Sequence, residues 1–413
     1  MRRLIPFALA VVLLIATRAH AVDRVWANAA NGAWNTAANW NPAGVPTAAD
    51  DLTIPFAVTV SINNGGNGLA NSLTITSGAT INRGGGRVMT VTGGITVTPS
   101  GNVTINVPFT AASLTKTGSG TLTLTGLSLS GAGAEVSGAV NVTGGTLLLN
   151  GPNTFTTGGT VTVGTGATLT RAGTGTLAPG GGLTVNGGAV TFPASGDLNS
   201  GGPVTLNGGS MTFNASGGLS ATGQTLTVGA GSSISTTAGA SISVGSVAIN
   251  GGSVSFGGNG NLNASGAVSV GGGGSLSFAG SGNVFSQSFA LALGSSFTVN
   301  FATGGDPTNV ILAGGSGSLN GTVNITGTPN TNTSFNLVTG AGSVDITGVT
   351  LGSAPTGFTF GFRTSGTTTI ILDVRTNPIV PETTASATGS CGTPLTWQHT
   401  ICLLYTSPSP RDS

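Results

Sequence analysis

A single hydrophobic position returns along this chain every 21 or 22 residues. A Gly-rich corner follows each occurrence, and a second short run of β-forming residues follows most corners, as in Leu206–Phe213 and Ile249–Phe256. A fixed period of this length predicts a solenoid, because one coil cannot bury its own hydrophobic face and needs a neighbour. With gaps of 21, 22, 21, 22, 21 and 21, the position is occupied by Val142, Val163, Val185, Leu206, Val228, Ile249 and Val270.

The pattern inside each repeat predicts short strands. Val, Leu, Ile or Phe alternates with Thr, Ser or Asn over a few residues, which is the two-residue period of a half-buried strand. We therefore expect an all-β, right-handed parallel β-helix with two or three strands per coil and coils ~4.8 Å apart. Ile75 and Val97 fit the period upstream, and Leu293 is the next match downstream. Four phenylalanines at equivalent places are expected to stack in the core: Phe192, Phe213, Phe256 and Phe278.

The N-terminus has the three parts of a secretory signal peptide. Met1–Arg3 supplies positive charge, Leu4–Ala16 is a short apolar run, and Ala19–Ala21 is a small-x-small cleavage site. We expect cleavage after Ala21, a mature chain that starts at Val22, and a secreted, extracellular or outer-cell-surface location. No later stretch is apolar enough to form a transmembrane helix.

The C-terminus resembles a sequencing artefact. Cys402–Asp412 matches the translation of a transposase-type sequencing adapter, so we expect the natural sequence to break off near Ile401. Removing this segment and the signal takes four basic residues and one acidic residue from totals of 11 and 10, which leaves a net charge of about −2. Without a basic patch, nucleic acid is not an expected partner. Cys391 is then left without an intrachain partner.

Composition divides the chain into segments. Three tryptophans, Trp26, Trp34 and Trp40, mark the region before the repeats. They are expected to close the open end of the solenoid, and the alternative is an aromatic platform for carbohydrate. The predicted segments are a signal peptide (1–21), an N-terminal cap (22–51), β-helix repeats (52–300), C-terminal coils or a cap (301–375), a linker (376–390), the start of a further β domain (391–401) and the adapter artefact (402–413).

Charged side chains are too sparse to indicate catalysis. Glu135 and Asp197 are 62 residues apart, near three coils, which places them about 14 Å apart along the axis, too far for a carboxylate pair. We expect isolated, solvated charges, no catalytic residue and no cofactor. His20 leaves with the signal and His399 stands alone, so no metal site is expected either.

A second column precedes the hydrophobic one and is rich in threonine. A flat threonine array could order water and bind ice, but the column after the hydrophobic position holds Gly and Asn, which are typical of turns. The favoured interpretation is β-propensity with stacked side-chain hydrogen bonds, and a surface-binding ladder is the alternative. Its members are Thr162, Thr184, Thr205 and Thr227.

One repeat resembles a known family. Leu147–Val163 reads LLLNGPNTFTTGGTVTV and, with one extra Thr, is similar to the autotransporter-associated β-strand repeat. The tryptophan-rich start, with Val45-Pro46 and Asp51-Leu-Thr-Ile-Pro55, resembles the opening module of large bacterial surface proteins, and residues 310–375 resemble the end of such repeat regions. The resemblance implies a bacterial surface or secreted protein of adhesin or passenger type.

These observations lead to one main hypothesis and two alternatives. The main hypothesis is a non-catalytic, adhesin-like solenoid, part of a longer multidomain protein, that serves as a rigid stalk or multivalent surface for host or environmental glycans or proteins. One alternative is the spacer or binding region of a polysaccharide-processing secreted protein whose catalytic domain follows the linker. The other is an ice- or glycan-binding module.

Overall fold

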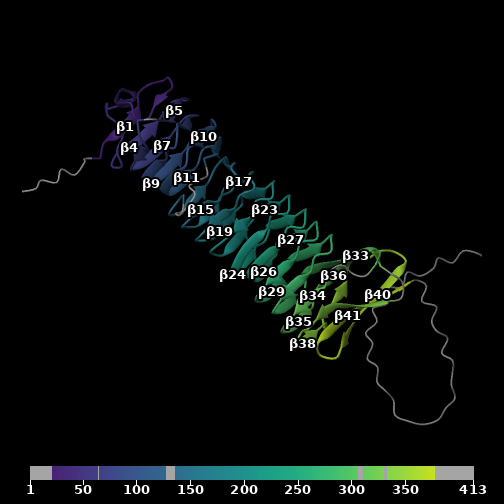
Figure 1. Ribbon diagram of the computed structural model, residues 1–413. Coiled ribbons are helices and arrows are strands. Elements are labelled where there is room, and N and C mark those ends of the chain that lie inside the picture. Colours follow the sequence, from purple (N-terminus) through teal and green to yellow (C-terminus); the bar gives the residue numbers. More distant parts are fainter. Residues whose placement is uncertain (1–20, 64, 127–134, 306–309, 330–332, 377–413) are drawn as a thin grey trace, which may run out of the picture.

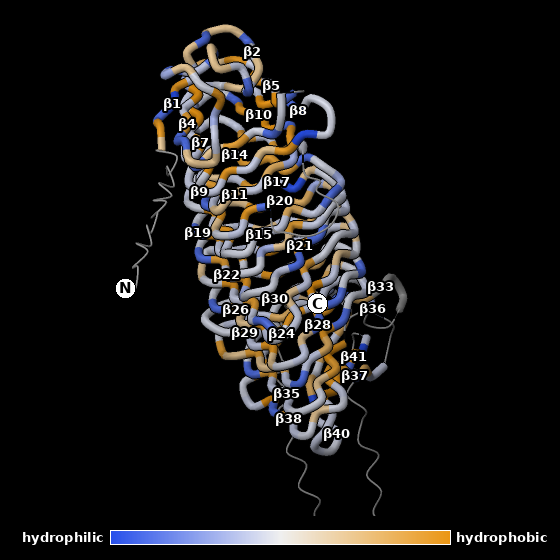
Figure 2. The backbone as a smooth tube through the Cα atoms, turned by 60° about the vertical axis from the view of Figure 1, so that its left-hand side comes forward, coloured by the Kyte–Doolittle hydropathy of each residue, from blue (hydrophilic) through white to orange (hydrophobic). Residues whose placement is uncertain are grey.

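The chain forms a rod of stacked β-coils. The computed structural model describes residues 21–63, 65–126, 135–305, 310–329 and 333–376, so most of the predicted signal and the predicted linker, further β domain and adapter segment after Thr376 lie outside the described residues. Figure 1 shows a solenoid, and Figure 2 shows its rungs from the side, with hydrophobic segments recurring along the rod. The fold is the predicted all-β solenoid; one short 3-10 helix, Ala37–Asn39, interrupts the strands of the described chain.

One sheet, called sheet B here, runs along one side of the rod and receives one strand from each coil. Its strands follow one another along one edge in Figure 1 and pair in parallel. They are β2 (Gly32–Ala33), β5 (Thr59–Ile62), β8 (Thr80–Arg83), β10 (Val103–Asn106), β12 (Thr121–Leu124), β14 (Thr146–Leu149), β17 (Thr168–Arg171), β20 (Ala189–Phe192), β23 (Ser210–Phe213), β25 (Ser233–Thr236), β27 (Ser253–Phe256), β30 (Ser275–Phe278), β33 (Ser296–Gly305), β36 (Thr322–Pro329) and β39 (Thr350–Leu351).

The second sheet, sheet A, receives two short strands from most coils, or one long strand that covers both rows. The long strands are β9 (Met89–Val97), β11 (Phe109–Lys116), β24 (Leu219–Val228) and β26 (Ile242–Asn250). The others are β1 (Asp23–Trp26), β3 (Trp40–Asn41), β4 (Asp51–Ile54), β6 (Gly68–Ala70), β7 (Ser72–Ile75), β13 (Val140–Val142), β15 (Phe155–Thr157), β16 (Val161–Val163), β18 (Leu177–Pro179), β19 (Leu183–Asn186), β21 (Leu198–Asn199), β22 (Val204–Asn207), β28 (Leu262–Ala264), β29 (Ala267–Gly271), β31 (Val284–Ser286), β32 (Ser288–Leu291), β34 (Ile311–Ala313), β35 (Ser316–Leu319), β37 (Thr333–Thr339), β38 (Ser343–Asp345), β40 (Phe358–Ser365) and β41 (Thr369–Thr376).

The predicted hydrophobic column is a column of directly paired residues in sheet A. Val142 pairs with Val163, and the register continues without a slip through Val270. Upstream, Ile75 pairs with Val97 as expected. The downstream expectation was wrong, because the partner of Val270 is Leu291 and Leu293 is 80% exposed. The alternation of apolar residues runs past the end of β32 into a corner, where Gly294 has a φ of +80° and the chain turns away from the core.

The predicted phenylalanine column is confirmed in sheet B. Phe192 pairs with Phe213 with ring centroids 4.5 Å apart, and Phe256 pairs with Phe278 with centroids 4.6 Å apart. Thr236 fills the intervening rung between Phe213 and Phe256. The rings lie nearly parallel because successive coils repeat the same backbone, which orients equal side chains alike.

Glycine shapes the corners between the last sheet A strand and the sheet B strand. Successive corners hold a glycine with positive φ, as at Gly166, Gly187 and Gly208 with 72°, 75° and 76°. Residues with a Cβ rarely adopt this conformation, so the Gly-rich corners of the sequence reflect a backbone requirement that is repeated in each coil from β13 to β33.

Each end of the rod is closed by antiparallel pairing. At the N-terminal end β3 pairs with β1, and β1 then starts sheet A by pairing in parallel with β4. At the other end β40 and β41 form a hairpin, and β41 pairs with β37. These antiparallel strands cover part of the sheet A edge at each end, whereas sheet B begins with β2 and ends with β39. Among the described residues, no helix has the length and apolar character needed to cross a bilayer.

Candidate functional site

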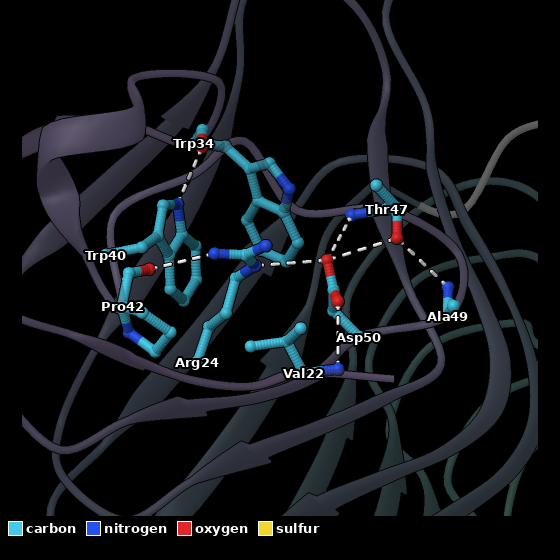
Figure 3. Close-up of polar contacts among 8 residues, drawn as sticks. All are labelled: Val22, Arg24, Trp34, Trp40, Pro42, Thr47, Ala49 and Asp50. Atoms are coloured by element: carbon cyan, nitrogen blue, oxygen red, sulfur yellow. Dashed lines mark hydrogen bonds and ion pairs between the residues drawn. The ribbon is translucent and has the colours of Figure 1, made fainter. Parts of the chain in front are cut away.

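The three tryptophans of the N-terminal segment form one buried cluster. Trp26 lies in β1, Trp40 in β3, and Trp34 directly after β2; each is at most 1% exposed. The ring of Trp40 packs edge-on against both others, with centroids 5.0 Å from Trp26 and 5.4 Å from Trp34. The Trp40 indole Nε1 also donates a 2.8 Å hydrogen bond to the Trp34 carbonyl (Figure 3). Because the rings pack against one another, they cover the end of the core and do not present an open face for stacking.

A partly buried ion pair joins β1 to the residue that precedes β4, within the cap. Arg24 Nε lies 3.1 Å from Asp50 Oδ2, and Arg24 Nη1 donates to the Pro42 carbonyl (Figure 3). Asp50 also accepts hydrogen bonds from the amides of Val22 and Thr47 and from the Thr47 hydroxyl. Burial alone would raise the pKa of Asp50, but these hydrogen bonds outweigh it and hold the pKa below its ordinary value. The carboxylate is therefore a structural anchor for the cap.

The predicted threonine ladder is a single outward column of sheet A. Thr162, Thr184, Thr205 and Thr227 pair in consecutive rungs, and each is half-exposed. Asn141 precedes them and Ala248 follows. The column beside this ladder is short: Asn186 and Asn207 end β19 and β22 and pair with each other, and Asn207 Nδ2 donates to Asn186 Oδ1 at 3.0 Å. The same position is a glycine outside the strands in the adjoining coils, at Gly164 and Gly229.

Sheet B carries the two-column hydroxyl array that the ladder lacks. Each strand presents two half-exposed outward residues, two positions apart, and most of them are Thr or Ser. The triplets T-L-T, S-M-T, S-I-S, S-V-S and S-L-S were the sequence signal for this face. The first column is Thr121, Thr146, Thr168, Ala189, Ser210, Ser233, Ser253, Ser275, Ser296 and Thr322; the second is Thr123, Leu148, Thr170, Thr191, Thr212, Ser235, Ser255, Ser277, Thr298 and Asn324.

Hydrogen bonds run along the second column of this face. The hydroxyls of Thr170 and Thr191 lie 3.0 Å apart, and the Ser235 hydroxyl donates to Thr212 Oγ1 at 3.3 Å. A shallow groove of about 310 Å³ follows the Gly-rich corner beside the first column. It is lined by backbone and small side chains, such as Gly187, Gly208 and Ser210. A ligand that lies along the rod axis can therefore come close to the backbone of this face and of its groove.

The acidic residues do not converge. Val136, next to Glu135, and Leu198, next to Asp197, lie three rungs apart in sheet A. Asp197 is exposed and accepts a hydrogen bond from the Gly218 amide. Among the described residues, no three His, Cys, Asp or Glu side chains gather as a metal-binding group. The arrangement offers neither paired carboxylates nor a cation cage.

The expectation of solvated charges was wrong for three residues. Glu135 is 7% exposed, and Lys116 and Arg171 are fully buried. Lys116 pairs with Val97 and Val142 in the hydrophobic column of sheet A, and Arg171 pairs with Leu149 in sheet B. The register imposes an inward direction on these positions, and backbone carbonyl oxygens around the two cations make the burial possible.

Comparison with known proteins reaches only the start of the chain. Residues 25–123 match a family model described as a domain of unknown function, DUF8693. The match includes the tryptophan cap and the first coils of the solenoid. No curated protein and no solved structure matches the chain.

Proposed function

We propose that this chain is the non-catalytic stalk, or adhesin-like passenger, of a secreted or cell-surface bacterial protein that carries autotransporter-associated β-strand repeats. The observation that supports it best is the unbroken register of the inward column of sheet A, from Ile54 to Leu319. Within the described residues, each coil pairs with the next through both sheets. A load along the rod axis is therefore shared by all the hydrogen bonds between two neighbouring coils.

The geometry suits projection of a surface away from a cell. Fifteen strands of sheet B at ~4.8 Å spacing give a rod on the order of 70 Å long. The antiparallel pairs at the two ends cover part of the edge of sheet A and limit its pairing with other chains. Along such a rod, weak contacts to surface glycans or proteins add through avidity.

Single-molecule stretching of the full chain tests the stalk. We expect unfolding in steps of one coil or a few coils, each coil releasing roughly 70 Å of chain at 3.3–3.4 Å per residue. Attachment of beads coated with the chain to bacterial, animal and environmental surfaces then tests adhesion. A single unfolding event at low force, with no retained beads on any surface, would contradict both parts of the proposal.

The hydroxyl face of sheet B favours a second candidate, a module that binds ice or a neutral glycan. No charged residue occurs between Asp197 and Asp306, so much of this face is uncharged. Tetrahedral hydrogen bonding at about 2.8 Å places second-neighbour waters about 4.5 Å apart, close to the ~4.8 Å rung spacing. The face is therefore suited to an uncharged, hydroxyl-bearing lattice.

Matched variants separate this candidate from the stalk. Thr170→Tyr with Thr212→Tyr places bulky rings on sheet B, and Thr162→Tyr with Thr205→Tyr places them on sheet A in the same two coils. Thermal hysteresis and pull-down with insoluble neutral polysaccharides are the readouts. Loss of activity in the first pair alone supports binding by sheet B, whereas inactivity of the unmodified chain in both assays removes the candidate.

A further inference from the structure

Three buried charges lie in consecutive coils near the N-terminal third of the rod. Lys116 ends β11, Glu135 directly precedes the bridge at Val136, and Arg171 ends β17. They are the only charged residues between Arg87 and Asp197 in the sequence. The rest of this section of the core is almost entirely apolar. The charges are thus concentrated in one section of an otherwise uncharged rod.

The two cations are held by backbone oxygens. Arg171 Nε donates to Gly175 O at 3.1 Å, Nη1 to Leu149 O at 3.0 Å, and Nη2 to Asn153 O. Lys116 Nζ donates to the carbonyls of Gly118 and Gly144. Neither cation forms an ion pair within the part of the chain that the structure describes. Backbone dipoles therefore hold both cations, and no carboxylate of the described residues lies within ion-pair distance of either.

Glu135 is the group of this section that titrates near neutral pH. Its Oε2 is buried without a hydrogen-bond partner among the described residues. Burial raises the pKa of Glu135 to about 7, and the positive charge of Arg171 keeps it from rising further. The protonated side chain is thus the form that the folded coil accommodates best.

We propose that the strands β11, β13, β14 and β17, with the bridge at Val136, form a pH-responsive opening point of the rod, in which ionisation of Glu135 loosens the pairing around it. Because the folded coil holds the proton more tightly than the open chain does, its extra stability is fully present below pH 4.5 and is lost as the pH rises to about 7. The lowered pKa of Lys116 acts in the opposite sense, since stability then rises with pH towards 10.5. Coils on either side stay paired with their own neighbours, so a local opening here makes a hinge.

Hydrogen exchange of the full chain between pH 5 and pH 8, corrected for intrinsic exchange rates, tests this inference. We expect the opening of β11, β13 and β14 to increase by up to ~100-fold across this range, given a displacement of the Glu135 pKa from 4.5 to about 7. The distant strands β25 and β27 serve as the internal reference and should keep their protection.

Three variants make the test specific. Glu135→Gln should abolish the pH response of β11–β14, and the exposed control Asp197→Asn should retain it. Arg171→Met should move the midpoint of the response to higher pH, because the charge that lowers the pKa of Glu135 is gone. An equal pH response in β25 and β27, a response that persists in Glu135→Gln, or an unmoved midpoint in Arg171→Met would each overturn the inference.

Discussion

Thr236 occupies a position in the sheet B column that phenylalanine fills in the neighbouring coils. It pairs with Phe213 on one side and Phe256 on the other, and it is 2% exposed. Its hydroxyl has no hydrogen-bond partner among the described residues. A buried hydroxyl without a partner destabilises the coil, because its hydration is lost on folding and is not replaced.

Replacing Thr236 by Val should therefore stabilise the protein. The change keeps the β-branched shape and removes the unpartnered hydroxyl, so we expect a gain of about 1–2 kcal/mol in the free energy of opening this coil. Hydrogen exchange of β25 and the guanidinium denaturation midpoint measure it. Thr212→Val, on the outward face of the neighbouring rung, is the matched control and should give no gain. A lower midpoint for Thr236→Val would indicate that the hydroxyl has a partner in solution.

The prediction that the charges are solvated relied on residue type and was wrong for Lys116 and Arg171. The alternation of apolar and polar residues in their strands predicts the correct, inward direction. Leu114-Thr-Lys116 and Leu169-Thr-Arg171 place both cations at inward positions of their strands. The sequence gives no sign of the carbonyl oxygens that receive their protons, because these come from corners 18 to 28 residues away as well as from nearby ones. Burial of a charge depends on such non-local partners and cannot be read from one strand.

At the scale of elements, the N-terminal cap shows what a local pattern can and cannot predict. Trp26, Trp34 and Trp40 indicated a closing structure, since the open end of a solenoid has to be covered. The short strands between them have no alternation; β2 is only Gly32–Ala33. The antiparallel pairing of β1 with β3, and the division of β1 and β2 between the two sheets, therefore had no sequence signal.

Truncation of the central indole should open the cap. Trp40→Ala removes both ring contacts and the hydrogen bond to Trp34 O, and we expect a loss of ~3–5 kcal/mol in local stability. Faster hydrogen exchange in β4 and β5, with unchanged exchange in β30 and β33, is the expected result. Val45→Ala, at a cap residue that is 46% exposed, is the control and should leave all four strands unaffected. Equal destabilisation at both ends would mean that the rod unfolds as one unit.

At the scale of the whole molecule, the fold was predictable because the repeat constrains every coil in the same way. The column from Val142 to Val270 gave the sheet A register, and four phenylalanines gave the sheet B column. The extrapolation to Leu293 failed because it accepted a gap of 23 residues after Val270, whereas the register keeps the gap of 21 that leads to Leu291. Leu293 lies past the end of β32, in a corner that Gly294 turns. The hydroxyl face of sheet B was overlooked for a different reason: triplets such as S-I-S recur in the sequence, but their alignment on one face follows only from the position of the sheet B strand in each coil.

Contacts between nearest neighbours also predict that one coil can be removed. Deleting residues 242–261 joins Ser241 to Leu262, which pairs with Ile242 in the intact rod. Leu276 and Phe278 then take the places of Val254 and Phe256. We expect a folded rod shorter by ~4.8 Å with nearly unchanged thermal stability, because each coil contacts only its neighbours. Circular dichroism and the maximum dimension from small-angle X-ray scattering measure the two effects.

The control deletion removes half a coil. Without residues 242–250, the strand β26 is lost from sheet A, while β27, the sheet B strand of the same coil, remains. The coils on either side then cannot pair through both sheets, and we expect loss of cooperative structure beyond β24. If both deletions were tolerated equally, the rod would owe its stability to its closed ends and not to the register of its coils. If neither were tolerated, contacts beyond nearest neighbours would have to couple the coils.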